Sequence, residues 1–221
     1  SFETLGAVPK NGITTIYNGI DLERFKRNEQ ANLEVRLALG LSDNDLMLLA
    51  VGRLHEAKDY PNLFHAIEIL LKQDDEHKNI YLFVVGDGDL RSELEHLITE
   101  KKLSTQVHLL GRRSDIPQLM SAADLFILSS SFEGFGLVVA EAMACQTYVV
   151  ATDCGGVKEV MGDTGILVQP KNSLDLAQAL MRAINLSDVE VIQNNMKAVM
   201  HVSKNFDLKI IVTKWLEIYA K

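Results

Sequence analysis

The sequence predicts a doubly wound α/β fold, in which helices cover both faces of a mostly parallel sheet. Short apolar runs alternate along the chain with helical patterns, as in repeated strand and helix units. The runs are apolar throughout, for example at Leu125–Leu128, which indicates strands that are buried on both faces and therefore parallel. Glycine-rich turns follow these runs, at the end of a parallel sheet where ligands bind in folds of this class.

The composition is typical of one soluble domain. The chain has 221 residues, of which 47% are hydrophobic, enough for one well-filled core. Its formal charge of −8 argues against sequence-independent nucleic-acid binding, which requires clustered lysines and arginines. No apolar run approaches the roughly 20 residues that cross a bilayer, and no charged and then apolar leader opens the chain. Cys145 and Cys154 lack metal-ligand spacing, so we expect reduced thiols in a cytoplasmic protein.

The expected elements follow one another as strand and helix from residue 46 onward. Before them, residues 13–17 form a β-rich run that ends in a turn at Asn18 and Gly19. Strands are expected at residues 46–51, 80–85, 107–110, 125–128, 148–151 and 165–168. Helices are expected between them at residues 62–72, 90–101, 116–122, 137–145 and 157–161.

After Pro170 the chain is predicted to be helical, at residues 174–186, 189–204 and 208–221. The last of these helices carries a wide apolar stripe that includes Ile211, Trp215 and Tyr219. No strand follows this helix in the sequence, so its stripe must pack against something else. Either the stripe covers the sheet of this domain, or part of it is exposed in this chain.

The stretch at residues 124–144 contains the strongest candidate for a ligand site. A strand ends in three serines, and a turn with Gly134 and Gly136 leads into a helix that begins near Leu137. The first amides of that helix have no intrahelical acceptor and lie at the positive end of its dipole, so they suit an anion. Glu133 lies at the rim of this turn, where it can accept hydrogen bonds.

Glu141 is expected on an otherwise apolar helix face, because its neighbours one turn away are Leu137, Val138, Ala144 and Cys145. An ionised carboxylate in such a place needs partners. A vicinal diol such as a ribose would donate two hydroxyls to it, as ribose does to acidic residues in other nucleotide sites.

The loop after the first predicted strand contains Gly52, Arg53 and Lys58. Two cations five residues apart can lie over one anion, and a diphosphate beside Glu133 and Glu141 would need such cations. Alternatively, Arg53 and Lys58 are solvated surface charges, as exposed arginines and lysines commonly are.

The turn after the second predicted strand contains Gly86, Asp87, Gly88, Asp89 and Arg91. As a dinucleotide fingerprint it fails, because Arg91 occupies the third glycine position. The two aspartates have the spacing of a metal-binding pair, but the same spacing recurs elsewhere in the chain, so it is weak evidence. The structural alternative is that one aspartate caps the following helix.

Two further turns carry candidate residues. Arg112 and Arg113 follow the third predicted strand, where they could contact a base or lie on the surface before a helix cap at Ser114 or Asp115. A Gly155-Gly156 turn opens the helix at residues 157–161, and Glu159 in its first turn is an acid that the helix dipole favours. The six histidines are scattered, and only His55 lies in a candidate ligand loop.

The segment Glu-Gly-Phe-Gly-Leu-Val-Val-Ala-Glu-Ala-Met-Ala, from Glu133 to Ala144, resembles the acidic signature of glycosyltransferase family 4. The resemblance extends from Ile16 to about Phe206. Enzymes of this family are retaining, use nucleotide diphosphate sugars and have the two-domain GT-B fold. The resemblance therefore implies that this chain is the Rossmann-like donor-binding domain of such an enzyme, with a glycan, a lipid-linked sugar or a small molecule as acceptor.

The resemblance also implies the roles of individual residues. Arg53 and Lys58 would hold the diphosphate and act in catalysis together with Glu133, which orients the sugar, while Glu141 binds the ribose. The expected donor site comprises Gly52, Arg53, Lys58, Gly86, Arg112, Glu133, Gly134, Phe135, Gly136, Leu137 and Glu141. No metal or other cofactor is expected, because two cations and a helix start already balance the charge of the departing nucleotide.

The domain organisation expected from the resemblance has three parts. Residues 1–25 would be a linker from a missing amino-terminal domain, residues 26–205 the nucleotide-sugar-binding domain, and residues 206–221 a helix that crosses back to the first domain. The missing half would hold most of the acceptor site and any peripheral membrane contact, so this chain alone is expected to be inactive. In one departure, Gln146 stands where the family usually has a glycine after the helix.

Two other functions remain open. The chain could be a non-catalytic nucleotide-binding or interaction module of the same fold, which docks through its last helix. A dehydrogenase or methyltransferase with a related sheet is the third possibility, but the sequence lacks the glycine fingerprint of dinucleotide-binding proteins.

Overall fold

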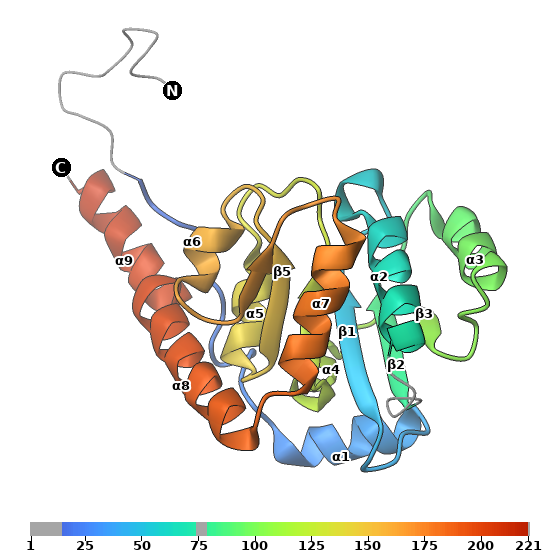
Figure 1. The fold of residues 1–221 in the computed structure, drawn as a ribbon. Coiled ribbons are helices and arrows are strands. Elements are labelled where there is room, and N and C mark those ends of the chain that lie inside the picture. Colours follow the sequence, from blue (N-terminus) through green and yellow to red (C-terminus); the bar gives the residue numbers. More distant parts are fainter. Residues whose placement is uncertain (1–14, 74–78, 221) are drawn as a thin grey trace, which may run out of the picture.

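The described part of the chain forms a parallel six-stranded sheet with helices on both faces (Figure 1). The computed structural model describes residues 15–73 and 79–220. The strand order is β3-β2-β1-β4-β5-β6, and all neighbouring strands are parallel. The order reverses between β1 and β4, which is the switch point where doubly wound folds bind ligands. The predicted fold class is confirmed.

The strands and helices expected from residue 46 onward are present with small shifts at their ends. The strands are β1 (Leu46–Val51), β2 (Ile80–Val85), β3 (Val107–Gly111), β4 (Leu125–Leu128), β5 (Tyr148–Thr152) and β6 (Ile166–Val168). The helices that follow them are α2 (Tyr60–Gln73), α3 (Arg91–Glu100), α4 (Ile116–Ala122), α5 (Leu137–Ala144), α6 (Val157–Met161) and α7 (Ser173–Ile184). The chain ends with α8 (Asp188–Asn205) and α9 (Leu208–Tyr219).

Two elements were not predicted, namely α1 (Glu29–Ala38) and a short 3₁₀ helix, η2 (Glu56–Lys58). Helix α1 buries only Ala31 and Val35, so its apolar period is too thin to detect, and Asn28 caps its start. Of the predicted β-rich run, residues 15–17 form no strand, and residues 13 and 14 lie outside the described residues. Residues 1–14 of the expected linker and Lys221 of the expected last helix also lie outside them.

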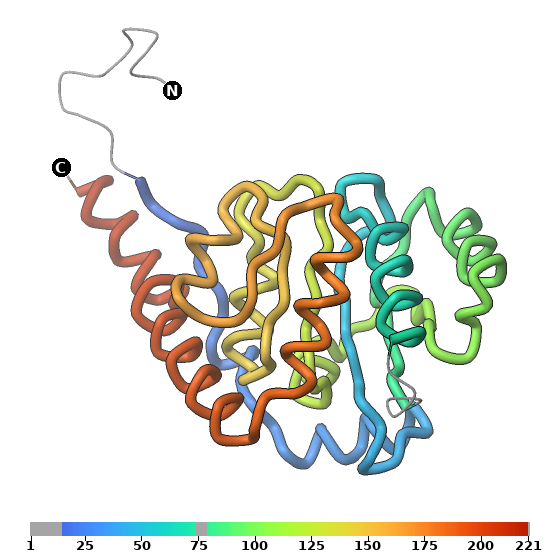
Figure 2. Tube along the Cα trace, in the orientation of Figure 1, coloured from blue at the N-terminus to red at the C-terminus, as the bar shows by residue number. Residues whose placement is uncertain are grey.

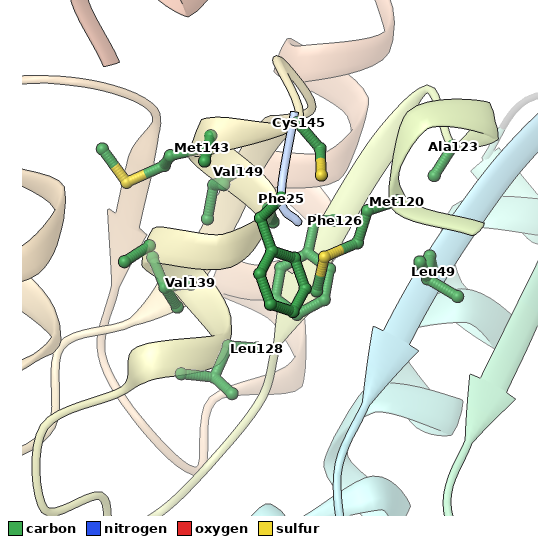
Figure 3. Close-up of a cluster of buried hydrophobic side chains, with 14 of the residues drawn as sticks. Phe25, Leu49, Met120, Ala123, Phe126, Leu128, Val139, Met143, Cys145 and Val149 are labelled. Atoms are coloured by element: carbon green, nitrogen blue, oxygen red, sulfur yellow. The ribbon is translucent and has the colours of Figure 1, made fainter. Parts of the chain in front are cut away.

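Apolar side chains form one core on each face of the sheet. Met47 and Leu49 point to the face that α4, α5 and α8 cover, whereas Leu48 and Ala50 point to the face under α2 and α7. Figure 3 shows the first core, where Phe25 lies beside Met120 and Phe126. The chain at the end of the expected linker is therefore anchored in this core.

The alternative that an aspartate caps α3 is wrong, and the expected cap of α4 has the right position but no capping bond. Neither Asp87 nor Asp89 caps α3, because Leu90 occupies the N-cap position without a side-chain hydrogen bond and Asp87 accepts from the Gly88 amide at 3.0 Å. Asp115 occupies the N-cap position of α4 but makes no capping bond, since its carboxylate pairs with Arg113. In both cases a nearer donor competes with the helix amides for the carboxylate.

The apolar stripe of α9 is largely exposed. Ile211 is buried, whereas Trp215 and Tyr219 are 44% and 78% exposed. The tube in Figure 2 shows α9 running along the flank of the molecule and not over the sheet. Within the described residues, the stripe therefore does not cover the sheet, which excludes one of the two alternatives. No helix among residues 15–73 and 79–220 is long and apolar enough to span a membrane.

The end of α5 shows how the chain closes a helix without the glycine that the resemblance leads one to expect there. Gln146 adopts a left-handed conformation, with φ of 59°. Its amide donates to Met143 O at 3.0 Å, and the Thr147 amide donates to Ala142 O at 3.1 Å. These bonds form a Schellman motif, in which glycine is the usual residue because a Cβ strains the left-handed position.

We predict that Gln146→Gly stabilises the protein by about 1 kcal/mol, because it relieves this backbone strain. Chemical denaturation of the variant, of Gln146→Ala and of the wild type measures the effect. Gln146→Ala retains a Cβ and is the control, which should gain nothing. An equal gain in both variants would contradict the explanation.

Candidate functional site

The loops that follow β1 and β4 are tied together at the switch point of the sheet. The Ser131 amide donates to Ala57 O at 2.9 Å, and Ser129 Oγ donates to Lys58 O at 2.8 Å. These bonds fix the backbone of Lys58 beside the serine loop. Lys58 and Glu133, which are 75 positions apart in the sequence, are thereby brought into contact.

The two loops meet in an ion pair between Lys58 Nζ and Glu133 Oε1. The side chains are only 20% and 13% exposed. Ser130 Oγ donates to the same carboxylate oxygen at 2.8 Å, and Thr152 Oγ1 donates to Ser130 O at 2.6 Å. The ends of β4 and β5 thus hold the carboxylate from one side, while the β1 loop supplies the ammonium group.

The Lys58 ammonium group reaches Glu133 because the aliphatic part of the Lys58 side chain packs over Gly52. A Cβ on Gly52 would lie 3.0 Å from Lys58 Cε. Tyr60 Oη donates to Gly52 O at 3.1 Å, and burial, together with the nearby Glu133 carboxylate, raises the pKa of Tyr60, so it remains a donor. His55 Nδ1 caps η2 by accepting from the Ala57 amide. This gives His55 a structural task that its sequence position did not indicate.

Arg53, the second predicted cation, is exposed and makes no ion pair within the described residues. The structure therefore brings Lys58, but not Arg53, to Glu133. Arg53 lies in the loop between Gly52 and the buried Leu54, at the carboxyl end of β1, where its side chain extends into solvent.

The start of α5 offers free amide groups next to Glu133. Gly136 is its N-cap residue, with φ of +85°, and no side chain of the described residues caps it. Side chains cap α1, α7, α8 and α9, whereas α3, α4 and α6 also begin without a side-chain cap. The first amides of α5 are left as donors at the positive end of the helix dipole, a combination that binds anions.

The Gly155-Gly156 turn packs directly against the loop that carries Glu133. A Cβ on Gly155 would lie 1.8 Å from Glu133 O, and one on Gly156 would lie 3.2 Å from Phe135 Cα. Only residues without a side chain allow this close approach. The turn that follows β5 therefore supports the backbone of the candidate site from behind.

Glu141 lies on the second turn of α5, apart from the Lys58 ion pair, among apolar groups. Burial raises the pKa of its carboxyl to about 7, and the positive charge of Arg24 only partly opposes this effect. The carboxylate is thus short of partners in this structure, as the sequence pattern indicated.

A hollow of about 310 Å³ lies at the carboxyl ends of β1, β2 and β3. It is lined by Val51, Gly52, Val85, Gly86, Arg112, Arg113 and Ile116. Arg113 donates two hydrogen bonds to Asp115, at 2.9 and 2.6 Å. The Arg112 side chain is 87% exposed, and its Nε makes only a long contact of 3.8 Å with Asp87 Oδ2. Of the two arginines, Arg112 is the one available to a ligand.

The ring of Phe135 packs into an aromatic cluster. It stacks on Tyr17 with a centroid distance of 5.6 Å and meets the edge of Phe206 at 5.4 Å. Tyr17 in turn donates a hydrogen bond to Glu159. The side chain of Phe135 therefore joins the glycine loop to the segment before α1.

Several residues that shape the site were not singled out in the sequence. Ser130, Tyr60 and Thr152 have no individual signal, because serine and threonine at strand ends are common and a tyrosine at a helix start, such as Tyr60, is not distinctive. The serine run from Ser129 to Ser131 predicts only a turn. Its position directly before Glu133 was the available indication that a hydroxyl would hold the carboxylate.

The chain matches one known protein family and is similar to several solved structures. The sequence profile of the family described as Glycosyl transferases group 1 matches residues 33–198. The chain is similar to the structure of HepE from Anabaena in complex with UDP, with a TM-score of 0.87 and 30% identity over 99% of this chain and 60% of that chain. The UDP-glucose complex of HepE is similar too, with a TM-score of 0.85 and 30% identity over 98% of this chain and 60% of that chain.

Two relatives with similar sequences are also named as glycosyltransferases. An uncharacterized glycosyltransferase of Methanocaldococcus jannaschii is 33% identical over 208 residues, which are 90% of this chain and 52% of the relative. The putative teichuronic acid biosynthesis glycosyltransferase TuaC of Bacillus subtilis is 37% identical over 168 residues, 74% of this chain and 39% of the relative. The chain spans about half the length of the curated relatives or less.

Because the folded-state pKa of Glu141 is raised, ionisation of Glu141 costs stability. The wild type should therefore lose stability as the pH rises from about 4.5 to above 7, relative to Glu141→Gln. We expect the two proteins to be equally stable near pH 4, and the variant to be more stable by about 1 to 2 kcal/mol at pH 8 after discounting for partial exposure. Denaturation at a series of pH values measures this difference, and a difference that is independent of pH would contradict it.

Gly155→Ala should destabilise the protein by about 2 to 4 kcal/mol, because the new Cβ meets Glu133 O and the backbone has φ of +55°. Gly134→Ala is the matched control, since a Cβ there meets nothing within 4 Å, and it should cost less than about 0.5 kcal/mol. Denaturant unfolding of both variants measures the contrast. Similar losses in the two variants would show that the close approach is not the cause.

Proposed function

This chain belongs to the glycosyl transferases group 1 family, and from that premise we propose that it is the donor-binding half of a retaining, family 4 enzyme with a nucleoside diphosphate sugar as donor. The observation that carries the proposal is the Lys58–Glu133 pair beside the uncapped start of α5 at the switch point. This arrangement presents a cation, a hydrogen-bond acceptor and free amides to one space.

The proposed donor extends from the glycine loop to the hollow at β1 to β3. Its diphosphate lies against Lys58 and the amides from Gly134 to Leu137, where positive charge stabilises the departing nucleotide. Arg53 extends into solvent and turns onto the diphosphate when the donor binds. Glu133 then exchanges part of its contact with Lys58 for hydroxyls of the sugar.

The nucleoside occupies the rest of the site. Glu141 accepts the two ribose hydroxyls, which supply the partners that its carboxylate lacks. The base enters the hollow lined by Gly52, Gly86 and Arg112. Uridine is the proposed nucleoside, because the similar HepE structures contain UDP and UDP-glucose. No metal is required in this arrangement, because Lys58, Arg53 and the helix start carry the compensating charge.

The acceptor side of the enzyme belongs to another part of the protein in this proposal. The chain covers 52% of its M. jannaschii relative, which leaves room for a second domain of similar size. We propose that residues 1–25 link to this domain, that residues 26–205 bind the donor and that residues 206–221 cross back with their exposed stripe. The chain by itself would then bind donor without transferring the sugar, and any contact with the cytoplasmic membrane surface would come from the other domain.

Isothermal titration of UDP, GDP, ADP and UDP-glucose into this chain tests the donor site. We expect UDP and UDP-glucose to bind, and Lys58→Met to weaken both at least about tenfold, because a charge-assisted phosphate contact is lost. Lys72→Met removes a lysine that is 72% exposed and pairs with Glu68 on α2, and it should leave binding unchanged. Absence of nucleotide binding, or equal effects of the two variants, would contradict the proposal.

The pH dependence of UDP-glucose binding tests the role of Glu141. UDP-glucose has no phosphate group that titrates near neutrality, so a change of its affinity with pH reports ionisation of the protein. Because the carboxyl has a pKa of about 7 and accepts best when ionised, affinity should rise by up to about tenfold between pH 6 and pH 8. The rise should disappear in Glu141→Gln, and its persistence there would rule out this ribose contact.

A further inference from the structure

Helix α8 has an apolar outer face that nothing in the described chain covers. Its inner face packs on α5 and α6, where Asn195, Ala198 and Val202 are buried. Four large apolar side chains on the outer face are 58% to 64% exposed, namely Val189, Ile192, Met196 and Met200. Their spacing of three, four and four residues places them in one stripe along the helix, on the flank of the molecule seen in Figure 1.

A hollow of about 390 Å³ borders this stripe. It lies between the end of α7, the first half of α8 and the sheet, at the opposite end of β1 from the donor site. Ile184, Leu186 and Val191 line it, and Ile192 and Met196 belong to both the hollow and the stripe. Charged residues, among them Arg27, Glu29 and Asp188, also line the hollow, so the stripe borders a space with both apolar and charged walls.

The charges of α8 are arranged to fit a second, antiparallel copy of the same helix. Its first turn carries Asp188 and Glu190, and its last turn carries Lys204. When two such helices lie antiparallel, each acidic turn meets a basic turn, and the helix dipoles are also opposed favourably. Lys197 completes a helix with two acidic and two basic residues, so there is no basic excess to attract an anionic lipid surface.

We propose that the outer face of α8 is a homodimer interface, in which two copies pack antiparallel about a twofold axis near Met196. Ile192 and Met200 are each four residues from Met196, so each Ile192 would lie level with Met200 of the other copy. Asp188 and Lys204 are each eight residues from it, so the oppositely charged turns would lie level too. One helix pair is a small interface, so the dimer is weak and depends on concentration.

Sedimentation equilibrium of the 221-residue chain over a concentration series tests the interface. The wild type should show a reversible monomer and dimer equilibrium, and Met196→Glu should raise the dissociation constant at least about tenfold, because two carboxylates would face each other at the axis. Met196 is 60% exposed, so the monomer should fold, which circular dichroism checks. Trp215→Glu, which changes the exposed stripe of α9 in the same way, should leave the dimer intact.

Charge reversal tests the antiparallel arrangement itself. Asp188→Lys and Lys204→Glu should each weaken the homodimer, and an equimolar mixture of the two variants should regain dimers, because opposite charges meet again in the heterodimer. A wild type that is monomeric throughout, or a dimer that Trp215→Glu disrupts and Met196→Glu does not, would overturn the proposal. So would a monomeric chain whose outer α8 face binds phosphatidylglycerol vesicles.

Discussion

The ion pair between Lys58 and Glu133 is the interaction on which the rest of the site depends. Each partner lies mostly out of water, where an unpaired charge would cost several kcal/mol. The pair survives because the backbone bonds between the β1 and β4 loops hold both groups in place, and because Ser130 adds a hydrogen bond to the carboxylate. A parallel sheet brings these loops together only where its strand order reverses.

Close backbone contacts set the shape of this edge of the sheet. A Cβ on Gly86 would lie 1.9 Å from Gly52 O, just as one on Gly155 would meet Glu133 O. The turns after β1 and β2 therefore touch through their backbones, and so do the turns after β4 and β5. Side chains are excluded from these contacts, which leaves the hollow at the first pair of turns open and packs the second pair closely against the glycine loop.

The two acids of the proposed donor site differ in their surroundings. Glu133 has a cation and a hydroxyl as partners, whereas Glu141 has apolar neighbours and a pKa raised to about 7. Glu133 is thus paired within the chain, whereas the Glu141 carboxylate has no ion pair or side-chain hydrogen bond among the described residues. The different environments assign them different tasks, sugar and ribose in the proposed function, although both lie within one short segment.

The sequence by itself determined the fold class, the strands from Leu46 to Val168 and the glycine loop with its two acids, because period, burial and turn chemistry are local properties. It could not reveal α1, whose apolar stripe has two buried residues, or the caps, where Arg113 competes for Asp115. Only the tertiary structure decided that Lys58, and not Arg53, meets Glu133, and that Arg112 stays exposed with one long contact to Asp87 while Arg113 is held by Asp115. These pairings depend on which loops the strand order brings together. The spacing of residues along the chain does not reveal how far apart two loops lie in the folded protein.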